Sequence, residues 1–354
     1  MNDSDFTNYT DLFTNTTETN MPGYWAARVG FNAIGGTAIA IFGLIGNVIS
    51  IIVLMNYKQE SSTPLLLTFL AVFDFIFLFF ELFLEQLTML SKFGLITAAY
   101  RPFITPIYVL FIAVPRIAFT GTMTMTILIT IERFVVVVHP LRAARLCCKP
   151  MARKAIVCVF IWAVVFNIPR YLAYTTYEKS DPKTNTTRTK FIRTEFGESN
   201  LYNDIFIIWI TFTLEFLIPF IIILALNAQL LLAIRRSREF APKSMKKRNE
   251  SGGRLNAMVL AVTTMFFLCG MMSASALILV RGVNKYEDCS VACNNYIAVA
   301  DTMLIINSSV NIILYCAVGK KFRTIFMKVF CCRRKRISYP LSVKSNTKTT
   351  SFSG

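Results

Sequence analysis

Ionisable side chains lie inside segments of the chain that are otherwise long runs of apolar residues. Asp74, Glu81 and Glu85 all fall within the apolar stretch 64–90. In a helix, offsets of 7 and 11 residues return to within about 20° of one direction, so the three carboxylates share a face. A charged group costs about 2.5–3.5 kcal/mol at the centre of a bilayer, which predicts that this face lines a hydrated interior. The alternative is that the carboxyl groups stay protonated and serve only in packing.

Other apolar stretches each carry one further charged residue. Four carboxylates and one guanidinium would give the interior a net negative charge, which predicts a cationic ligand. The expected ligand-binding residues are Glu81, Glu85, Arg116, Glu215 and Asp301. All of them except Glu215 fall in the outer halves of their stretches, where an extracellular ligand could reach.

A deeper polar group offers carboxylate, hydroxyl and amide oxygens, which suit a small hard cation such as Na⁺. Its members are Asn47, Asp74, Thr122, Asn307, Ser308 and Asn311. The alternative is a plain hydrogen-bond network that ties helices together. Apart from Na⁺ near Asp74 we expect no cofactor, and the single histidine, His139, argues against a zinc cluster.

The elements that must position these residues are apolar helices. The chain of 354 residues is 55% hydrophobic and only 16% charged, which is unusual for a soluble domain. Seven stretches are long enough to cross a bilayer: 29–56, 64–90, 103–138, 155–175, 204–234, 255–281 and 295–317. We therefore predict an all-α integral membrane protein, a seven-transmembrane helix bundle. The expected parts are an outer tail 1–28, the bundle 29–318, and 319–354, where the amphipathic helix Lys320–Phe330 precedes a basic tail.

Charge placement predicts the topology. The net charge of +17 does not indicate nucleic-acid binding, because Lys and Arg gather in the loops after the third and fifth stretches and after Lys320. Such loops face the cytosol. We expect a multi-pass plasma-membrane protein with an extracellular N-terminus, a cytoplasmic C-terminus, and N-glycosylation at Asn2, Asn8, Asn15 and Asn185.

Glu132 and Arg133 follow the third apolar run directly and precede the basic segment at His139-Pro140. A carboxylate beside the guanidinium offsets part of the cost of placing it at the membrane edge. The pair is interpreted as a releasable lock that holds the arginine inward. The alternative is an ordinary helix end at the membrane border.

An ordered set of motifs resembles the rhodopsin-like G-protein-coupled receptors. It comprises Gly46-Asn47, Leu70–Asp74, Glu132-Arg133-Phe134, Trp162, Pro219, Phe266–Cys269 and Asn307–Tyr315. Within that family, His139–Ala143, Phe166–Arg170 and Phe266–Cys269 are similar to invertebrate FMRFamide-type neuropeptide receptors.

The resemblance implies an extracellular neuropeptide ligand ending in Arg-Phe-amide, a heterotrimeric G protein as partner, and arrestin as a further candidate. It assigns activation and coupling to Glu132, Arg133, Asn311 and Tyr315. Cys331-Cys332, beside basic residues, resembles a palmitoylation site; two unmodified thiols are the alternative.

Four positions depart from the family pattern. Gly270 and Met272 replace a tryptophan and a proline, and Ile312 replaces the proline after Asn311, so both helix kinks should be weakened. Near Tyr108 the usual cysteine is missing. Cys289 and Cys293 could bridge within the third outer loop or remain free thiols.

The same residues admit other functions. A receptor for another peptide or small cation remains open. A transporter or channel would suit the acidic interior, but internal repeats are missing. With one histidine, no Ser-His-Asp set can assemble in the outer part, so we expect no catalytic residues and no enzyme.

Overall fold

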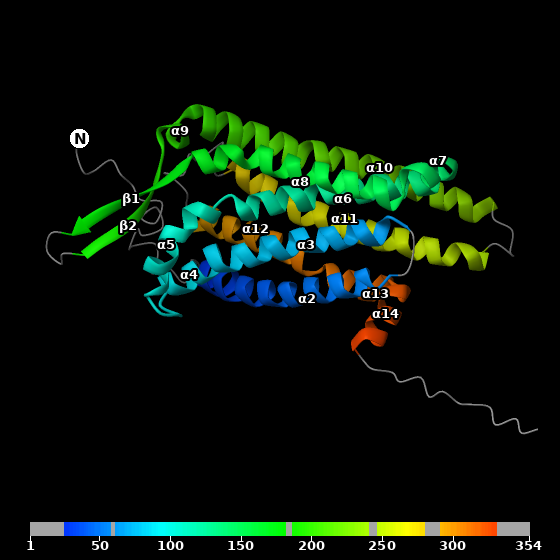
Figure 1. Cartoon of the computed structure of the whole chain (residues 1–354), viewed down its shortest axis with the longest axis horizontal. Coiled ribbons are helices and arrows are strands. Elements are labelled where there is room, and N and C mark those ends of the chain that lie inside the picture. Colours follow the sequence, from blue (N-terminus) through cyan, green and yellow to red (C-terminus); the bar gives the residue numbers. More distant parts are fainter. Residues whose placement is uncertain (1–24, 58–60, 182–185, 241–245, 280–290, 331–354) are drawn as a thin grey trace, which may run out of the picture.

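The helices run side by side along one long axis. A computed structural model describes residues 25–57, 61–181, 186–240, 246–279 and 291–330. A β-hairpin projects at one end of the bundle, and α14 turns away from the long axis at the other (Figure 1).

The elements follow the chain in this order, with η marking π-helical segments: η1 Trp25–Gly36, α2 Thr37–Met55, α3 Thr63–Glu81, η2 Leu82–Gln86, α4 Leu87–Lys92, α5 Tyr100–Phe111, α6 Val114–Val138, α7 Pro140–Leu146, α8 Lys149–Leu172, β1 Tyr174–Asp181, β2 Thr186–Arg193, α9 Glu195–Glu198, η3 Leu201–Ile210, η4 Phe212–Leu217, α10 Ile218–Phe240, α11 Lys246–Leu277, α12 Val291–Ser309, α13 Asn311–Val318 and α14 Lys320–Phe330. The strands pair antiparallel, with Tyr174 opposite Arg193.

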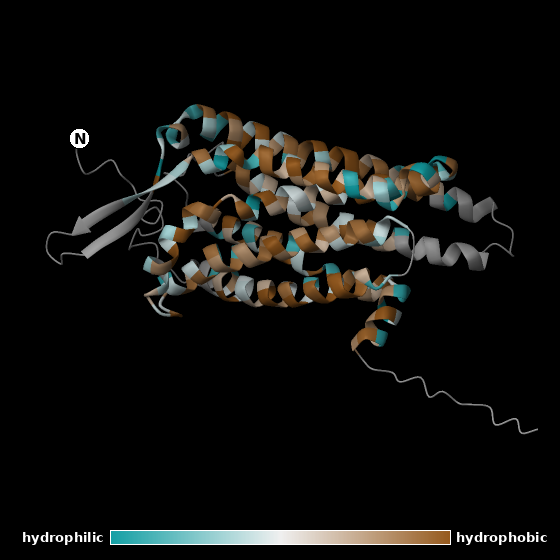
Figure 2. Ribbon diagram, in the orientation of Figure 1, coloured by the Kyte–Doolittle hydropathy of each residue, from teal (hydrophilic) through white to brown (hydrophobic). Residues whose placement is uncertain are grey.

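The predicted all-α membrane bundle is confirmed. In the described part of the chain, six helices are long and apolar enough to cross a membrane, and the bent pair α12–α13 makes a seventh crossing. Apolar residues cover the sides of the bundle (Figure 2). Ile45, Ile161 and Ile221 are each more than half exposed there, as expected for side chains that meet acyl chains.

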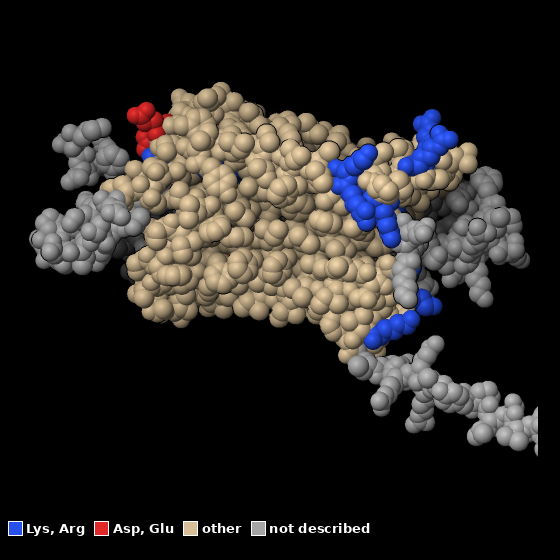
Figure 3. Space-filling model, in the orientation of Figure 1, with Lys and Arg blue, Asp and Glu red and all other residues tan. Residues whose placement is uncertain are grey.

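Charged residues that reach the surface gather at the two ends of the bundle. On the face drawn in Figure 3, Lys and Arg gather at the end that carries α7 and α14, and acidic residues appear near the end that carries the hairpin. The positive end is the one that the loop charges predict to face the cytosol. The helix predicted at Lys320–Phe330 is present as α14, with Phe322 buried and Lys320, Lys321 and Arg323 exposed.

The third predicted stretch, 103–138, is not one helix. It divides into α5 and α6, and only Val114–Val138 is a crossing. Pro115 explains the break, because proline has no N–H to donate, its ring clashes with the preceding turn, and it fits best in the first turn of a helix, where it stands in α6. The other six predicted stretches overlap observed helices, although the fourth begins earlier, at Lys149.

The seventh crossing is bent without its proline. The segments Asn295–Ser309 and Asn311–Val318 meet at 44°, so the expectation that Ile312 weakens this kink was wrong. Ser308 and Asn311, on the two sides of the bend, both bond the carboxylate of Asp74. These bonds constrain the bend where proline otherwise would. By contrast, α11 is one helix from Lys246 to Leu277 and passes through Gly270 without a break.

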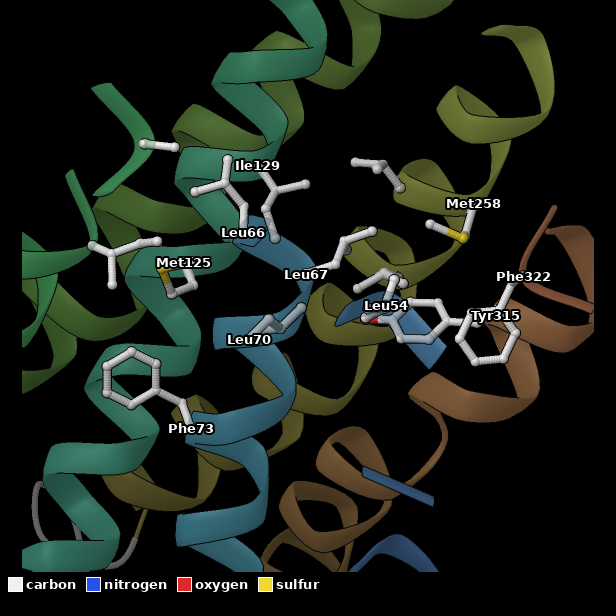
Figure 4. Close-up of a cluster of buried hydrophobic side chains, with 14 of the residues drawn as sticks. Leu54, Leu66, Leu67, Leu70, Phe73, Met125, Ile129, Met258, Tyr315 and Phe322 are labelled. Atoms are coloured by element: carbon white, nitrogen blue, oxygen red, sulfur yellow. The ribbon is translucent and has the colours of Figure 1, made fainter. Parts of the chain in front are cut away.

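The apolar core joins α3 to its neighbours along the bundle. Its inner part is drawn in Figure 4 and brings together Leu54, Leu66, Leu67, Leu70, Phe73, Met125, Ile129, Met258, Tyr315 and Phe322. A close approach of α3 to α6 depends on Gly121. A Cβ atom at that position would lie 2.4 Å from Cδ1 and 2.8 Å from Cγ of Phe73.

We predict that Gly121→Ala destabilises the protein. The added methyl group overlaps the root of a buried ring that cannot swing aside, and overpacking of this kind costs about 1–3 kcal/mol. The melting temperature of the purified protein in detergent should fall, and Phe73→Leu in the same chain should restore part of the loss. Gly35→Ala is the matched control, because its Cβ would meet only Gly30 O at 3.4 Å. A higher melting temperature for Gly121→Ala alone would contradict the packing argument.

Candidate functional site

Four of the five predicted ligand-binding residues lie together toward the end of the bundle that carries the β-hairpin, the end that the loop charges predict to be the outer one. The carboxylate of Glu81 interacts electrostatically with Glu85, Arg116 and Asp301, which come from η2, α6 and α12. Arg116 is exposed, and the three carboxylate side chains are half-buried. Three acids and one base therefore form a net negative group, which we call the outer carboxylate cluster.

A tyrosine extends this cluster to α5. The hydroxyl of Tyr108 donates to Oε1 of Glu85 at 2.5 Å, and the side chain of Gln86 bonds Glu81. Tyr108 occupies the region where the family usually has a cysteine, so here a hydrogen bond ties α5 to the bundle. The sequence marked Tyr108 only as a departure from the pattern, because nothing local indicates a partner 23 residues earlier.

Glu215 lies apart from the outer carboxylate cluster. Its carboxyl group accepts from the hydroxyl of Thr120 at 2.5 Å, and that hydroxyl accepts from Nδ2 of Asn167 at 2.9 Å. The side chain is 2% exposed and is not among the charges that act on Glu81. The five residues predicted to meet one ligand therefore occupy two places.

The deeper polar group surrounds Asp74. Thr122 donates to Oδ1 at 2.9 Å, Asn311 donates to Oδ2 at 2.7 Å, and Ser308 also bonds the carboxylate, which is fully buried. Nδ2 of Asn47 donates to the carbonyl oxygen of Ser308 at 2.9 Å, which adds α2 to the group. These bonds join members of the deeper polar group into one hydrogen-bond network.

The remaining member of that group, Asn307, is buried as well. Hydroxyl oxygens that donate to Asp74 keep lone pairs free, so the donor set fits a Na⁺ ion. In the described ranges no group of three or more His, Cys, Asp or Glu side chains is placed to hold a metal ion.

At the opposite end, Glu132 and Arg133 form the ion pair that the sequence suggested, with Oε2 of Glu132 3.0 Å from a guanidinium nitrogen. Both side chains are 5% exposed. Hydroxyls at the start of α3 complete the arrangement: Thr63 donates to Oε1 of Glu132 at 3.1 Å and accepts from Arg133, and Ser62 donates to Glu132. Sequence reasoning missed Ser62 and Thr63, because they lie about 70 residues away along the chain.

The loop between α7 and α8 is tied to the same pair. The hydroxyl of Ser62 lies 2.9 Å from the carbonyl oxygen of Cys147, and the backbones of Ser61 and Cys148 form a bridge. Burial raises the pKa of the Cys147 thiol, and the negative charge of Glu132 raises it further. The thiol therefore stays protonated at neutral pH.

Tyr315 is a buried residue of α13. Its ring is fully buried 5.5 Å from the ring of Phe322. Among the described residues, its hydroxyl and Nε of Arg133 have no hydrogen-bond partner. The hydroxyl of Tyr315 and Nε of Arg133, both in residues that the resemblance assigns to activation, are therefore free to form further hydrogen bonds in another conformation.

An aromatic ring occupies the place of the missing tryptophan. Phe220 lies so close to Gly270 that a Cβ there would be 2.8 Å from Cζ of the ring. The same ring contacts Phe266 and Phe267 edge-on, at centroid distances of 6.1 and 5.1 Å. Next to Gly270, the ring that joins α10 to α11 is therefore supplied by α10.

Several predicted modification sites cannot be placed. The glycosylation sites Asn2, Asn8, Asn15 and Asn185 and the lipidation sites Cys331 and Cys332 lie outside the described residues. Cys293 is disulfide-bonded, so the alternative of a free thiol is wrong for this residue; Cys289, with which a bridge was one of the two alternatives, lies outside the described residues.

Known proteins resemble this chain over most of its length. The family described as "7 transmembrane receptor (rhodopsin family)" matches residues 46–315, more than half of the chain. The FMRFamide receptor of Drosophila melanogaster is 28% identical over 95% of this chain and 60% of its own length. The chain thus spans less than two thirds of that relative. Somatostatin receptor type 4 of Rattus norvegicus and the allatostatin-A receptor of Bombyx mori are each 27% identical over 83% of this chain, and over 71% and 78% of their own lengths.

The charge of Glu132 should be visible in the reactivity of Cys147. Thiols react as thiolates, so Glu132→Gln, which removes a charge that raises the thiol pKa, should move the pH–rate profile of maleimide labelling at Cys147 to lower pH. Mass spectrometry of the labelled peptide separates Cys147 from the other cysteines. Glu132→Asp keeps the charge and is the control; an unchanged profile in Glu132→Gln would refute the assignment.

Proposed function

Because the chain belongs to the rhodopsin family of seven-transmembrane receptors, we propose that it is a G-protein-coupled receptor for an extracellular neuropeptide ending in Arg-Phe-amide. Proteins of this family are receptors and not enzymes. The observation that carries the proposal is the outer carboxylate cluster, in which Glu81, Glu85 and Asp301 stand against one cation, Arg116.

The charge balance of the cluster selects the ligand. A guanidinium is always protonated and forms paired, charge-assisted hydrogen bonds with carboxylates. A peptide arginine would bring the cluster close to neutrality, and an adjacent C-terminal amide adds no negative charge. The likeness to the Drosophila FMRFamide receptor supports the same ligand class.

Signalling would proceed by a shift between two conformations. In the present one, Arg133 is held by Glu132 and Thr63. A peptide that binds a second conformation more tightly moves the population by its difference in affinity and by no more than that. In that second conformation Arg133 would separate from Glu132 and contribute to a cytosolic pocket for the G protein.

The Asp74 network would stabilise the inactive arrangement. A Na⁺ ion held by the carboxylate together with Thr122 and Ser308 would supply positive charge at a fully buried acid. These residues hold α3, α6 and the bent pair α12–α13 against one another.

The first test is a panel of amidated peptides on the purified full-length protein in nanodiscs with a heterotrimeric G protein. An Arg-Phe-amide peptide should accelerate nucleotide exchange, and its citrulline analogue and its free acid should do so only at much higher concentration. Peptide-independent uptake of cations into vesicles, with no nucleotide exchange, would favour a transporter instead.

Removing a carboxylate from the cluster should weaken the arginine peptide selectively. Bonds to charged groups contribute about 1.5–3 kcal/mol, so Glu85→Gln or Asp301→Asn should lower its affinity roughly 10- to 100-fold. The citrulline analogue should change far less. Glu215→Gln is the matched control, since that carboxyl lies outside the cluster. Equal losses for both peptides would remove the pairing argument.

Weakening the ion pair between Glu132 and Arg133, which we call the inner lock, should raise basal signalling. Thr63→Val deletes a hydroxyl that bonds both Glu132 and Arg133. A hydrogen bond contributes about 0.5–1.5 kcal/mol net, so ligand-independent nucleotide exchange should rise roughly two- to tenfold by that estimate. Thr68→Val, on the same helix, deletes only a bond to Pro64 O and serves as the control. Unchanged basal exchange in Thr63→Val would mean that the pair does not restrain the receptor.

A further inference from the structure

A cavity lies on the flank of the bundle, apart from the outer carboxylate cluster. It has a volume of about 180 Å³ and lies between α6, α8, η4 and α10. Most of its lining is apolar and includes Met123, Ile127, Trp162 and Pro219. The proposed peptide function uses none of these side chains.

One polar group in the lining is incompletely bonded. Oε1 of Glu215 accepts from Thr120, but Oε2 is buried and has no hydrogen-bond partner among the described residues. The hydroxyl of Thr120 has only one hydrogen, and both Oε1 of Glu215 and the carbonyl oxygen of Arg116, 2.9 Å away, can accept it. No hydrogen of Thr120 is therefore left for Oε2. An unsatisfied buried oxygen carries a desolvation penalty that a ligand able to donate a hydrogen bond would remove.

The cavity borders the outer surface of the helices. Of its lining residues, Trp162 is 42% exposed, Ile218 41% and Leu214 38%, all within membrane crossings. Glu215 is close to the middle of the crossing Leu201–Ala233. A ligand would therefore enter from the hydrocarbon, at a depth that lipid headgroups do not reach.

We propose that this cavity is an intramembrane binding site for a small, bilayer-soluble molecule with a ring-shaped apolar body and one hydrogen-bond donor. The volume suits one ring, since an apolar cavity of about 150 Å³ holds benzene. The ring lies against Trp162 and Met123, and the donor binds Oε2 of Glu215.

The test uses a matched pair of probes, 4-(trifluoromethyl)phenol and 4-(trifluoromethyl)anisole, which differ in the donor. Fluorine NMR of the full-length protein in nanodiscs, against empty nanodiscs, measures specific binding. We expect saturable binding of the phenol and at least tenfold weaker binding of the anisole. No saturable phenol binding, or equal affinity for the two probes, would overturn the proposal without any variant.

Three substitutions locate the site. Thr124→Phe fills the cavity and should abolish saturable binding, whereas Ile161→Phe, which adds a ring on the outer face of α8 outside the lining, should leave it intact. Glu215→Leu should reduce the preference for the phenol over the anisole to less than twofold. Peptide-stimulated nucleotide exchange checks that each variant is folded. Phenol binding that survives Thr124→Phe in a folded protein would place the probe elsewhere and refute the site.

Discussion

Charged side chains inside the bundle require hydrogen-bond partners from other helices, because hydrocarbon offers none. Asp74 meets this requirement with a hydroxyl from α6 and an amide from α13, and Glu132 meets it with hydroxyls from the start of α3. Each bond fixes one helix against another. The polar groups proposed to carry function are thus also groups that hold the helices of the bundle against one another.

Close packing brings those partners within reach. The glycine at position 121 lets α3 approach α6 over the ring of Phe73, next to the residue that bonds Asp74. The apolar core in Figure 4 joins α3 and α6 to α11, α13 and α14. Tyr315 and Phe322 belong to this core, so the last crossing and the short helix after it pack against the same residues as α3 and α6.

Departures from the family pattern are offset by other contacts. The bend at Val310 persists without proline because polar residues on both sides of it bond Asp74. The space left by Gly270 is taken by Phe220 from the neighbouring helix. At the outer end, the bond between Tyr108 and Glu85 ties α5 to the bundle where a cysteine is missing. The helices are therefore held in place by interactions that differ from those of the usual family pattern.

Apolar length and charge placement are local properties of a chain, so the sequence alone was enough to predict the class of fold, the approximate bounds of six of the seven crossings, and the ion pair between Glu132 and Arg133. It also grouped Asp74 with Asn47, Thr122, Ser308 and Asn311 by their depth in the predicted stretches, and left open whether they hold Na⁺ or only tie helices together. The tertiary structure then fixed which helix faces which. It separated Glu215 from the outer carboxylates, divided the third stretch before Pro115, and brought Ser62 and Thr63 to the lock. Partners that lie tens of residues apart are set by packing, and no local pattern records them.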